Sequence, residues 1–323
     1  MSESLLNFLS SIGEEVVDAE EESFLLFSRT IPSNNLGFVN SRTTAIDLSI
    51  HNIDYTIRQS PTLLSSTRDG GTTGAVLWKI TPLFASWISA VTTNPFWSGI
   101  LGADTSVIEL GCGISGLVAL TLAPLVRKYV ATDQEYVRRF FGMNIEENAH
   151  SVHSSSKRGS SKKGHRRENT KRSKSNNIQF IPLDWELDIP SNQTLHNTNN
   201  SDTDDGPGSE NGFDIIISCD CIYNEALIPC FVRTCADICN LRSTQPEQVE
   251  PKNPTMAIIA QQQRSPDVFE AWLKESLKYF RVWRVEKFSS TVAGPEGDES
   301  GLGDGSGYVV HVLVLREGLR TAS

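Results

Sequence analysis

The sequence lacks the patterns that mark several classes of protein. Its six cysteines form no Cys-x-x-Cys pair and its six histidines no His-Glu-x-x-His pair, so neither a zinc ribbon, a disulfide framework nor a metal centre is indicated. No apolar run reaches the roughly 18 residues of a membrane span, and the start is too acidic for a targeting peptide. The net charge of −10 argues against a protein that binds nucleic acid over its whole surface.

What is present is a chain of 323 residues, 38% of them hydrophobic, which is enough to bury a full core. Cys219 and Cys221 alternate with apolar residues, and Cys235 and Cys239 stand at helical spacing, as reduced core cysteines do. We therefore expect a cytoplasmic protein, with a nuclear location as the alternative. We also expect a monomer that makes no contact with a membrane.

Composition divides the chain into three parts. An acidic N-terminal lead covers 1–35, a hairpin and lead-in helix cover 36–100, and the main domain covers 101–323. Two low-complexity inserts interrupt the main domain at 151–176 and 191–212, and we expect both to be disordered because they have too few apolar residues to build a core.

The second part carries two local signals. In "TAIDLSIHNIDYTIRQS" apolar residues alternate on both sides of His51-Asn52, which predicts a β-hairpin. Further on, Thr81-Pro82 has the pattern of an N-cap followed by proline at the first helical position, and predicts the lead-in helix.

Strand and helix patterns alternate through the main domain and predict an α/β fold. Near-continuous apolar strands separated by helices imply a parallel sheet covered on both faces. The last two strands, "FRVWRVEKF" and "GYVVHVLVLR", have no helix between them and should form an antiparallel pair. The other expected strands cover 105–110, 128–132, 178–183, 213–219 and 255–260, and the expected helices 116–127 and 136–148.

The stretch "VIELGCGISGLVAL" turns from strand to helix through Gly111, Gly113 and Gly116. The spacing satisfies G-x-G-x-x-G, the dinucleotide fingerprint, although a tight strand-to-helix connection without any ligand would also need these glycines. Glu109, two residues before the first glycine, suits a cationic head group or a ribose and would repel a pyrophosphate. It would also suit a role as a cap of the glycine turn.

Further acids follow the next strands. Asp133, in "VATDQE", has the spacing of an acid that binds ribose hydroxyls, and Asp184 and Trp185, in "PLDWE", are placed to border an adenine. A pocket rimmed by acids and without a phosphate site fits S-adenosylmethionine better than NAD, because the sulfonium and α-ammonium groups are positive. An NAD-dependent oxidoreductase stays open as an alternative.

The segments "IELGCGISG", "ATDQ", "LDWE" and "CDCIYNEALI" occur in order, preceded by "TTGAVLWKITPLFASWI". In these segments the chain resembles the class I seven-β-strand protein-lysine methyltransferases of the methyltransferase-like type, and most closely the fungal ribosomal lysine N-methyltransferase 5 family. The resemblance covers about 40–148, 178–190 and 213–317. It implies a Rossmann-like seven-stranded sheet in the order 3-2-1-4-5-7-6, with the last strand antiparallel, helices on both faces and an N-terminal β-hairpin.

The resemblance also implies roles for single residues. Trp78 would pack on S-adenosylmethionine, and Cys219 would line its pocket. Asp133 would bind the ribose and Trp185 the adenine, although both tryptophans would also suit ordinary core packing. The methionine part would lie against the backbone of Gly111, Cys112 and Gly113.

Asp220 and Tyr223 are the candidate catalytic residues. Asp220 would orient the incoming lysine amine by hydrogen bonding, and the Tyr223 ring would line the lysine channel. The alternative for Asp220 is a purely structural cap at the end of a strand.

The expected activity is therefore S-adenosylmethionine-dependent protein-lysine N-methylation of a ribosomal protein, most simply one of the large subunit. The basic insert 151–176 holds nine lysines and arginines against the single acid Glu168, which makes ribosomal RNA a candidate contact and a solvated loop the alternative. An N6-adenine methyltransferase would carry a proline-containing signature where this chain has "DCIY". Methylation of RNA or of another non-histone substrate, and a non-catalytic module that binds the cofactor, remain alternatives.

Overall fold

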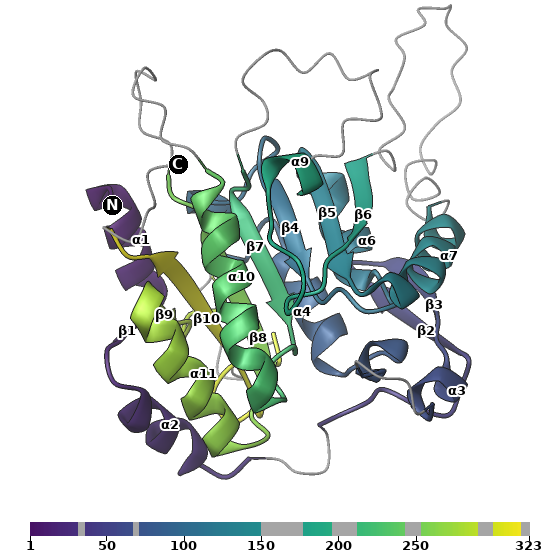
Figure 1. Cartoon of the computed structure of the whole chain (residues 1–323), viewed down its shortest axis with the longest axis horizontal. Coiled ribbons are helices and arrows are strands. Elements are labelled where there is room, and N and C mark those ends of the chain that lie inside the picture. The colour runs from purple at the N-terminus through teal and green to yellow at the C-terminus, as the bar shows by residue number, and fades with distance from the viewer. Residues whose placement is uncertain are drawn as a thin grey trace, which may run out of the picture.

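Eight strands form one sheet in the computed structural model, in the order β1-β9-β10-β8-β7-β4-β5-β6 (Figure 1). The model describes residues 1–31, 36–66, 71–149, 177–195, 212–242, 253–289 and 300–317. The strands are β1 (Glu15–Val16), β4 (Ser106–Leu110), β5 (Lys128–Asp133), β6 (Ile178–Pro182), β7 (Ile215–Cys219), β8 (Met256–Gln262), β9 (Phe280–Arg284) and β10 (Tyr308–Leu315).

The predicted strand order is confirmed for the seven strands from β4 to β10. β4 pairs in parallel with β5 and β7, and the parallel pairing continues outward to β6 and β8. β10 lies between β8 and β9 and runs antiparallel to both. The carboxyl ends of five parallel strands therefore meet at one edge, where open α/β sheets bind ligands.

The N-terminal lead supplies an eighth strand that the sequence did not predict. β1 pairs antiparallel with β9, through Glu15 opposite Trp283 and Val16 opposite Val282. The flanking helices are α1 (Glu3–Ile12) and α2 (Ala19–Phe27). Three apolar side chains on one face of α1 are buried, namely those of Leu5, Leu9 and Ile12. Although the segment is acidic, its apolar residues thus follow a helical period, and the helix buries its apolar face near this edge of the sheet.

Helices cover both faces of the sheet. One face packs against α1, α4 (Ile80–Ile88), α6 (Leu117–Leu122) and α7 (Arg138–Asn148). The other packs against α2, α10 (Ile228–Asn240) and α11 (Pro266–Tyr279), the last two lying in front of the sheet in Figure 1. The shorter turns are α3 (Pro61–Leu64), α5 (Phe96–Gly99), α9 (Asn192–Leu195), η1 (Thr73–Ala75), η2 (Ala123–Leu125), η3 (Glu135–Val137) and η5 (Glu225–Leu227).

Two predicted helix boundaries were wrong. α4 begins at Ile80 after Lys79 and has no side-chain N-cap, so Thr81 does not cap it; Pro82 lies in the first turn, where a missing N–H costs nothing. α6 ends at Leu122, because Pro124 cannot continue the α-helical hydrogen bonds and the chain tightens into η2.

The predicted hairpin is confirmed as β2 (Ala45–Ile50) and β3 (Ile53–Arg58). Its turn residues His51 and Asn52 have φ of +51° and +61°, as a two-residue hairpin turn requires. The hairpin forms a sheet of its own, so its place beside the main sheet depends on other contacts.

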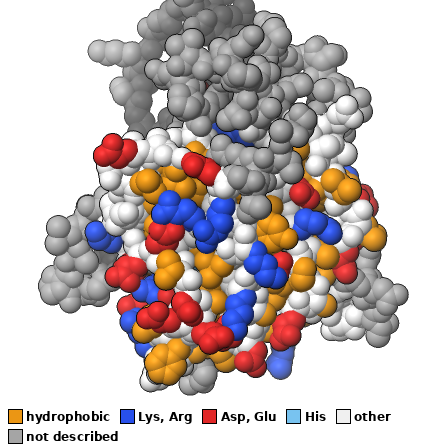
Figure 2. Space-filling model, turned by 60° about the vertical axis from the view of Figure 1, so that its left-hand side comes forward, with side chains coloured by type: hydrophobic (Ala, Val, Ile, Leu, Met, Phe, Trp, Pro, Cys, Tyr) orange, Lys and Arg blue, Asp and Glu red, His pale blue; other side chains and the backbone are white. Residues whose placement is uncertain are grey.

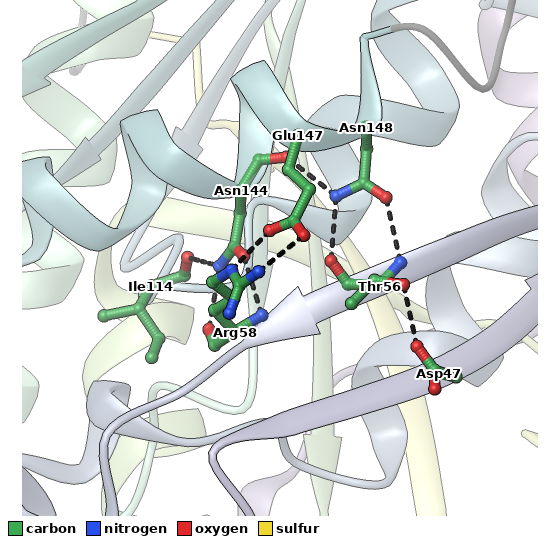
Figure 3. A network of polar contacts seen from close by, with 7 residues as sticks. All are labelled: Asp47, Thr56, Arg58, Ile114, Asn144, Glu147 and Asn148. Carbon is green, nitrogen blue, oxygen red and sulfur yellow. Dashed lines mark hydrogen bonds and ion pairs between the residues drawn. The ribbon is translucent and has the colours of Figure 1, made fainter.

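Two buried asparagines of α7 bind the backbone of β3 (Figure 3). Asn148 accepts the N–H of Thr56 at 2.9 Å and donates to its carbonyl at 3.0 Å. Asn144 makes the same pair with Arg58, at 2.8 and 2.9 Å, and also donates to the Ile114 carbonyl at 2.7 Å. The side-chain amides thus satisfy backbone groups of an edge strand.

The face that Figure 2 turns forward shows acidic and basic side chains side by side, with apolar side chains between them. Exposed ion pairs join Lys274 to Glu20 and Lys278 to Glu275. Among the described residues, no helix combines the length and apolarity needed to cross a bilayer.

Residues 151–176 lie outside the described residues, and so does most of the second insert. The described beginning of that insert differs from the prediction: it forms α9, and the Leu195 side chain is fully buried.

Candidate functional site

The glycine turn between β4 and α6 has a backbone conformation that favours glycine. Gly111 and Gly113 have left-handed backbone conformations, with φ of +70° and +59°. A Cβ atom on Gly111 would lie 2.4 Å from the Cys221 sulfur and 3.3 Å from the Trp185 ring. The backbone of the turn therefore packs directly against Cys221 and Trp185, with no room for a side chain at Gly111.

Asp133 ends β5 beside this turn. Its carboxylate accepts the N–H groups of Gly113 at 2.8 Å and of Gln134 at 2.7 Å. Burial raises the pKa of Asp133 to about 6, and the two backbone donors oppose that rise. Each carboxylate oxygen has a further lone pair, so the group is able to accept hydrogen bonds from ligand hydroxyls.

Glu109 is the second acid of the site and is only 2% exposed. Its Oε2 accepts a hydrogen bond from the Tyr129 hydroxyl at 2.8 Å. Burial raises the pKa of Glu109 to about 7; the Tyr129 hydrogen bond lowers it, and the charge of Asp133 raises it further. A cation bound beside Glu109 would favour its ionised form.

The loop after β6 supplies an aromatic wall. The Trp185 ring packs edge-on against Phe231 of α10, with ring centroids 5.1 Å apart. The indole N–H of Trp185 is buried and has no hydrogen-bond partner among the described residues. Asp184 accepts the N–H of Glu186 at 2.9 Å and so shapes the loop that holds Trp185.

The segment before α4 supplies another wall. The carbonyl of Gly74 accepts the Ile114 N–H at 2.9 Å, which ties the segment to the glycine turn. The indole N–H of Trp78 donates to the Thr73 carbonyl at 3.0 Å. The Thr73 hydroxyl in turn donates to the hydroxyl of Tyr223 at 3.1 Å. Trp78 and the 40%-exposed Tyr223 are thereby linked in one hydrogen-bonded chain.

Three thiols lie at the ends of the central strands. Burial raises the pKa of Cys112 and Cys219 well above the ordinary value, and that of Cys221 as well. They are therefore neutral at physiological pH and act as small packing groups rather than nucleophiles.

Asp220 has a different partner from the one predicted. We expected its carboxylate to orient a substrate amine, but its side chain is 2% exposed and both oxygens bind the Arg264 guanidinium, with Nη1 2.8 Å from Oδ1. Oδ1 also accepts the Gln262 N–H at 3.2 Å. The carboxylate is thus held in an ion pair with the loop after β8.

All the residues singled out from the sequence line one cavity of about 350 Å³ at the carboxyl edge of the sheet, a volume in the range of small-molecule sites. They are Trp78, Glu109, Gly111, Cys112, Gly113, Asp133, Asp184, Trp185, Cys219, Asp220 and Tyr223.

Sequence reasoning missed several residues of this cavity and one beside it. Thr73 and Gly74 also line it, and the "TTG" run before Trp78 was the available signal. Arg264 contacts two residues of the cavity wall, Asp220 and Trp78, but no local pattern pointed to it.

The arrangement fits the cofactor expected from the sequence. Two acids suit a cationic group and hydroxyls, and the backbone of the glycine turn and the Trp185 ring line the same cavity, where they suit a flat heterocycle. Within the described part of the chain, His, Cys, Asp and Glu side chains form no group of three or more that would hold a metal ion.

Comparison with known proteins places this site in a family. Residues 58–160 match the lysine methyltransferase family. The chain is 31% identical over 253 residues to ribosomal lysine N-methyltransferase 5 of Zygosaccharomyces rouxii, covering 71% of this chain and 72% of that protein. It is 26% identical to the protein of the same name from Lachancea thermotolerans, covering 71% and 75%.

A third relative has a different name. The chain is 33% identical over 142 residues to diaminohydroxyphosphoribosylamino-pyrimidine deaminase of Schizosaccharomyces pombe, which is 44% of this chain. The match spans only 33% of the deaminase's length.

Proposed function

The chain belongs to the ribosomal lysine N-methyltransferase 5 family, and on that premise we propose that it methylates a lysine of a ribosomal protein, one of the large subunit. The enzyme is a lysine methyltransferase with S-adenosylmethionine as its cofactor. The observation that supports the proposal is a single cavity that joins two acids of raised pKa to an aromatic mouth.

The residues of the cavity divide between cofactor and substrate. We assign Glu109 to the α-ammonium end, Asp133 to the ribose hydroxyls and Trp185 to the adenine. The bound cofactor supplies an electrophilic methyl group: the amine lone pair forms the new C–N bond while the C–S bond breaks and its electron pair stays on sulfur. Trp78 is assigned to the cofactor as well, and Tyr223 to the stem of the substrate lysine, since aromatic faces attract cationic and methylated amines by about 0.5–2 kcal/mol.

The reacting amine has to be neutral. With an ordinary lysine pKa of about 10.4, supplying the neutral amine at pH 7 costs about 4.6 kcal/mol unless the site lowers that pKa. The thiols are neutral, and burial raises the pKa of the Tyr223 phenol, so these groups add no negative charge. The lysine amine becomes the neutral nucleophile when it is buried among these uncharged groups and loses its proton to water.

Methyl transfer to ribosomes tests the substrate. Ribosomes from cells that lack the gene are incubated with the enzyme and methyl-labelled S-adenosylmethionine, and mass spectrometry locates the label. We expect it on a lysine of one large-subunit protein. Label in ribosomal RNA, or in no ribosomal component, would contradict the proposal. Gly111→Val is the negative control, because its side chain would occupy the space beside Cys221 and Trp185.

We also propose that the enzyme acts as a monomer in the cytoplasm and that 151–176 contacts ribosomal RNA. The nine basic residues of that segment support the RNA contact. Deleting 151–176 should then weaken methylation of intact ribosomes but not of the isolated substrate protein. Equal loss on both substrates would contradict an RNA contact.

A further inference from the structure

Arg264 connects three elements at the mouth of the cavity. It follows β8, and its two terminal nitrogens bind the two oxygens of Asp220 at the end of β7. Nη2 also donates to the Gln262 side chain at 3.1 Å. The guanidinium lies over the Trp78 ring, 4.4 Å from its centroid. One planar cation therefore fixes a carboxylate on its edge and an indole on its face.

The backbone of Asp220 is shaped for this contact. Asp220 has φ of +64°, a left-handed conformation that is unfavourable for a residue with a side chain. Its N–H donates to the Ala260 carbonyl at 2.7 Å, and its carboxylate accepts the Gln262 N–H. These bonds direct the carboxylate toward β8 and Arg264, at the wall of the cavity that Asp220 lines.

We propose that Arg264 is a positioning residue of the methyl transfer: it neutralises Asp220 and clamps Trp78, so that the channel receives the lysine as a neutral amine. The inference rests on the proposed function. Without Arg264, an uncompensated carboxylate would bind the lysine ammonium and stabilise the form that cannot attack. An opposite charge within about 4–6 Å favours the ionised form and raises the pKa of an amine by about 1–3.

The other titratable groups around this ion pair supply no such compensation. Among the described residues, four such groups face Asp220 or Arg264, and burial raises the pKa of each, so they are neutral at physiological pH. They are Cys219, Cys221, Tyr223 and Tyr308. Glu109 and Asp133 line the same cavity and carry acidic groups of raised pKa.

The pH dependence of kcat tests the proposal, because kcat at saturating substrate reports groups in the enzyme–substrate complex. In Arg264→Gln, kcat at pH 7 should fall at least tenfold, and the rising limb of the profile should move up by about one pH unit or more. Arg264→Lys keeps the charge but loses the planar fork, so it should lose rate several-fold without moving the limb. In the double variant Asp220→Asn/Arg264→Gln the limb should return to its wild-type position.

The chain contains a matched control. Arg281 makes the same kinds of contact, a two-nitrogen pair with Glu15 at 2.7 and 2.6 Å and a stack on Trp283 at 4.8 Å, on β9 beside the edge strand β1. Arg281→Gln should leave the limb in place, and calorimetry with S-adenosylhomocysteine should show cofactor binding within about twofold of wild type in all variants.

An unchanged limb in Arg264→Gln, or one that stays displaced in the double variant, would overturn the proposal. If Arg264→Gln does not fold, the pH profiles of the double variant and of Arg264→Lys test the proposal. A rising limb that moves in Arg264→Lys, which retains the charge, would then overturn the proposal. A wild-type enzyme that methylates no lysine would contradict the proposed function, and this inference with it.

Discussion

At the scale of single residues, the site is built from two buried acids whose pKa values are both raised. Glu109 has a neutral phenol as its hydrogen-bond partner, whereas Asp133 accepts two backbone N–H groups. Burial raises the pKa of Glu109 to about 7 and that of Asp133 to about 6, and the ordinary pKa of a glutamate already lies above that of an aspartate. Because the pKa of Glu109 lies near physiological pH, the affinity for the cofactor should depend on pH. Replacing Glu109 should remove this dependence.

We predict that affinity for S-adenosylmethionine falls about tenfold between pH 8 and pH 6, because the carboxylate of Glu109 is protonated below its pKa of about 7 and then carries no charge for the α-ammonium group. Glu109→Gln should bind weakly at pH 8 and lose most of this dependence. Titration calorimetry in buffers of different ionisation enthalpy measures both effects. A pH-independent affinity in the wild type would contradict the assignment of Glu109.

Asp133→Ala should weaken cofactor binding more than tenfold at pH 8, since hydrogen bonds to a charged group contribute about 1.5–3 kcal/mol each. The substitution also leaves the Gly113 N–H without its acceptor, so the glycine turn loses support. Asp133→Asn is the comparison, because it keeps an acceptor but no charge. Wild-type affinity in a folded Asp133→Ala protein would refute the ribose assignment.

At the scale of elements, the hairpin β2–β3 is attached to the core by side chains rather than by the main sheet. Asn144 and Asn148 stand one turn apart on α7 and take the place that a neighbouring strand would occupy beside β3 (Figure 3). Asn144 alone extends this contact to Ile114, next to the glycine turn. The two asparagines therefore differ in their connection to the cofactor site.

Asn144→Ala and Asn148→Ala should each destabilise the fold by about 1–3 kcal/mol, because each removes the hydrogen-bond partner of part-buried backbone groups of β3. Only Asn144→Ala should also weaken cofactor binding, since it releases the Ile114 carbonyl behind the glycine turn. Chemical denaturation and calorimetry on the two variants check this. Equal affinities in the two variants would mean that the Ile114 contact does not support the site.

At the scale of the whole molecule, the N-terminal segment is attached to the far side of the sheet by a buried charged cluster. Glu22 of α2, 5% exposed, pairs with Arg284 of β9 at 2.7 Å and lies 3.4 Å from Nε2 of the fully buried His311 of β10. Burial raises the pKa of Glu22, but the hydrogen bonds and charges of His311 and Arg284 lower it below its ordinary value on balance. The segment is thus an integral part of the fold.

Glu22→Gln should lower the free energy of unfolding by about 1.5–3 kcal/mol at pH 7, because it leaves the largely buried Arg284 with only the more exposed Glu286 as an acidic partner. The folded-state pKa of Glu22 is depressed, so its contribution is present above the unfolded-state pKa and is lost as pH falls through the folded-state pKa. The difference between wild type and variant should therefore shrink in acid. Glu20→Gln, whose Lys274 pair is exposed, is the control and should change stability by less than about 0.5 kcal/mol. Similar losses in both variants would contradict a special role for the buried cluster.

The sequence alone determined the features that local physics controls. The spacing of the glycines identified the turn at Gly111, because glycine adopts the left-handed backbone conformation found there far more readily than other residues. Alternating apolar strands and helices determined the central sheet, and the carboxyl ends of parallel strands brought Asp133 and Trp185 to one edge. These inferences needed only periodicity, chain direction and backbone sterics.

Only the tertiary structure decided what depends on contacts between distant segments. Asp220 meets Arg264, 44 residues further on, a pairing that no local pattern in the sequence indicated. Val16 joins the sheet beside Val282, although composition had divided the acidic lead 1–35 from the main domain. Side-chain hydrogen bonds and edge pairings are set by which elements become neighbours when the chain packs, and no local pattern in the sequence carries that information.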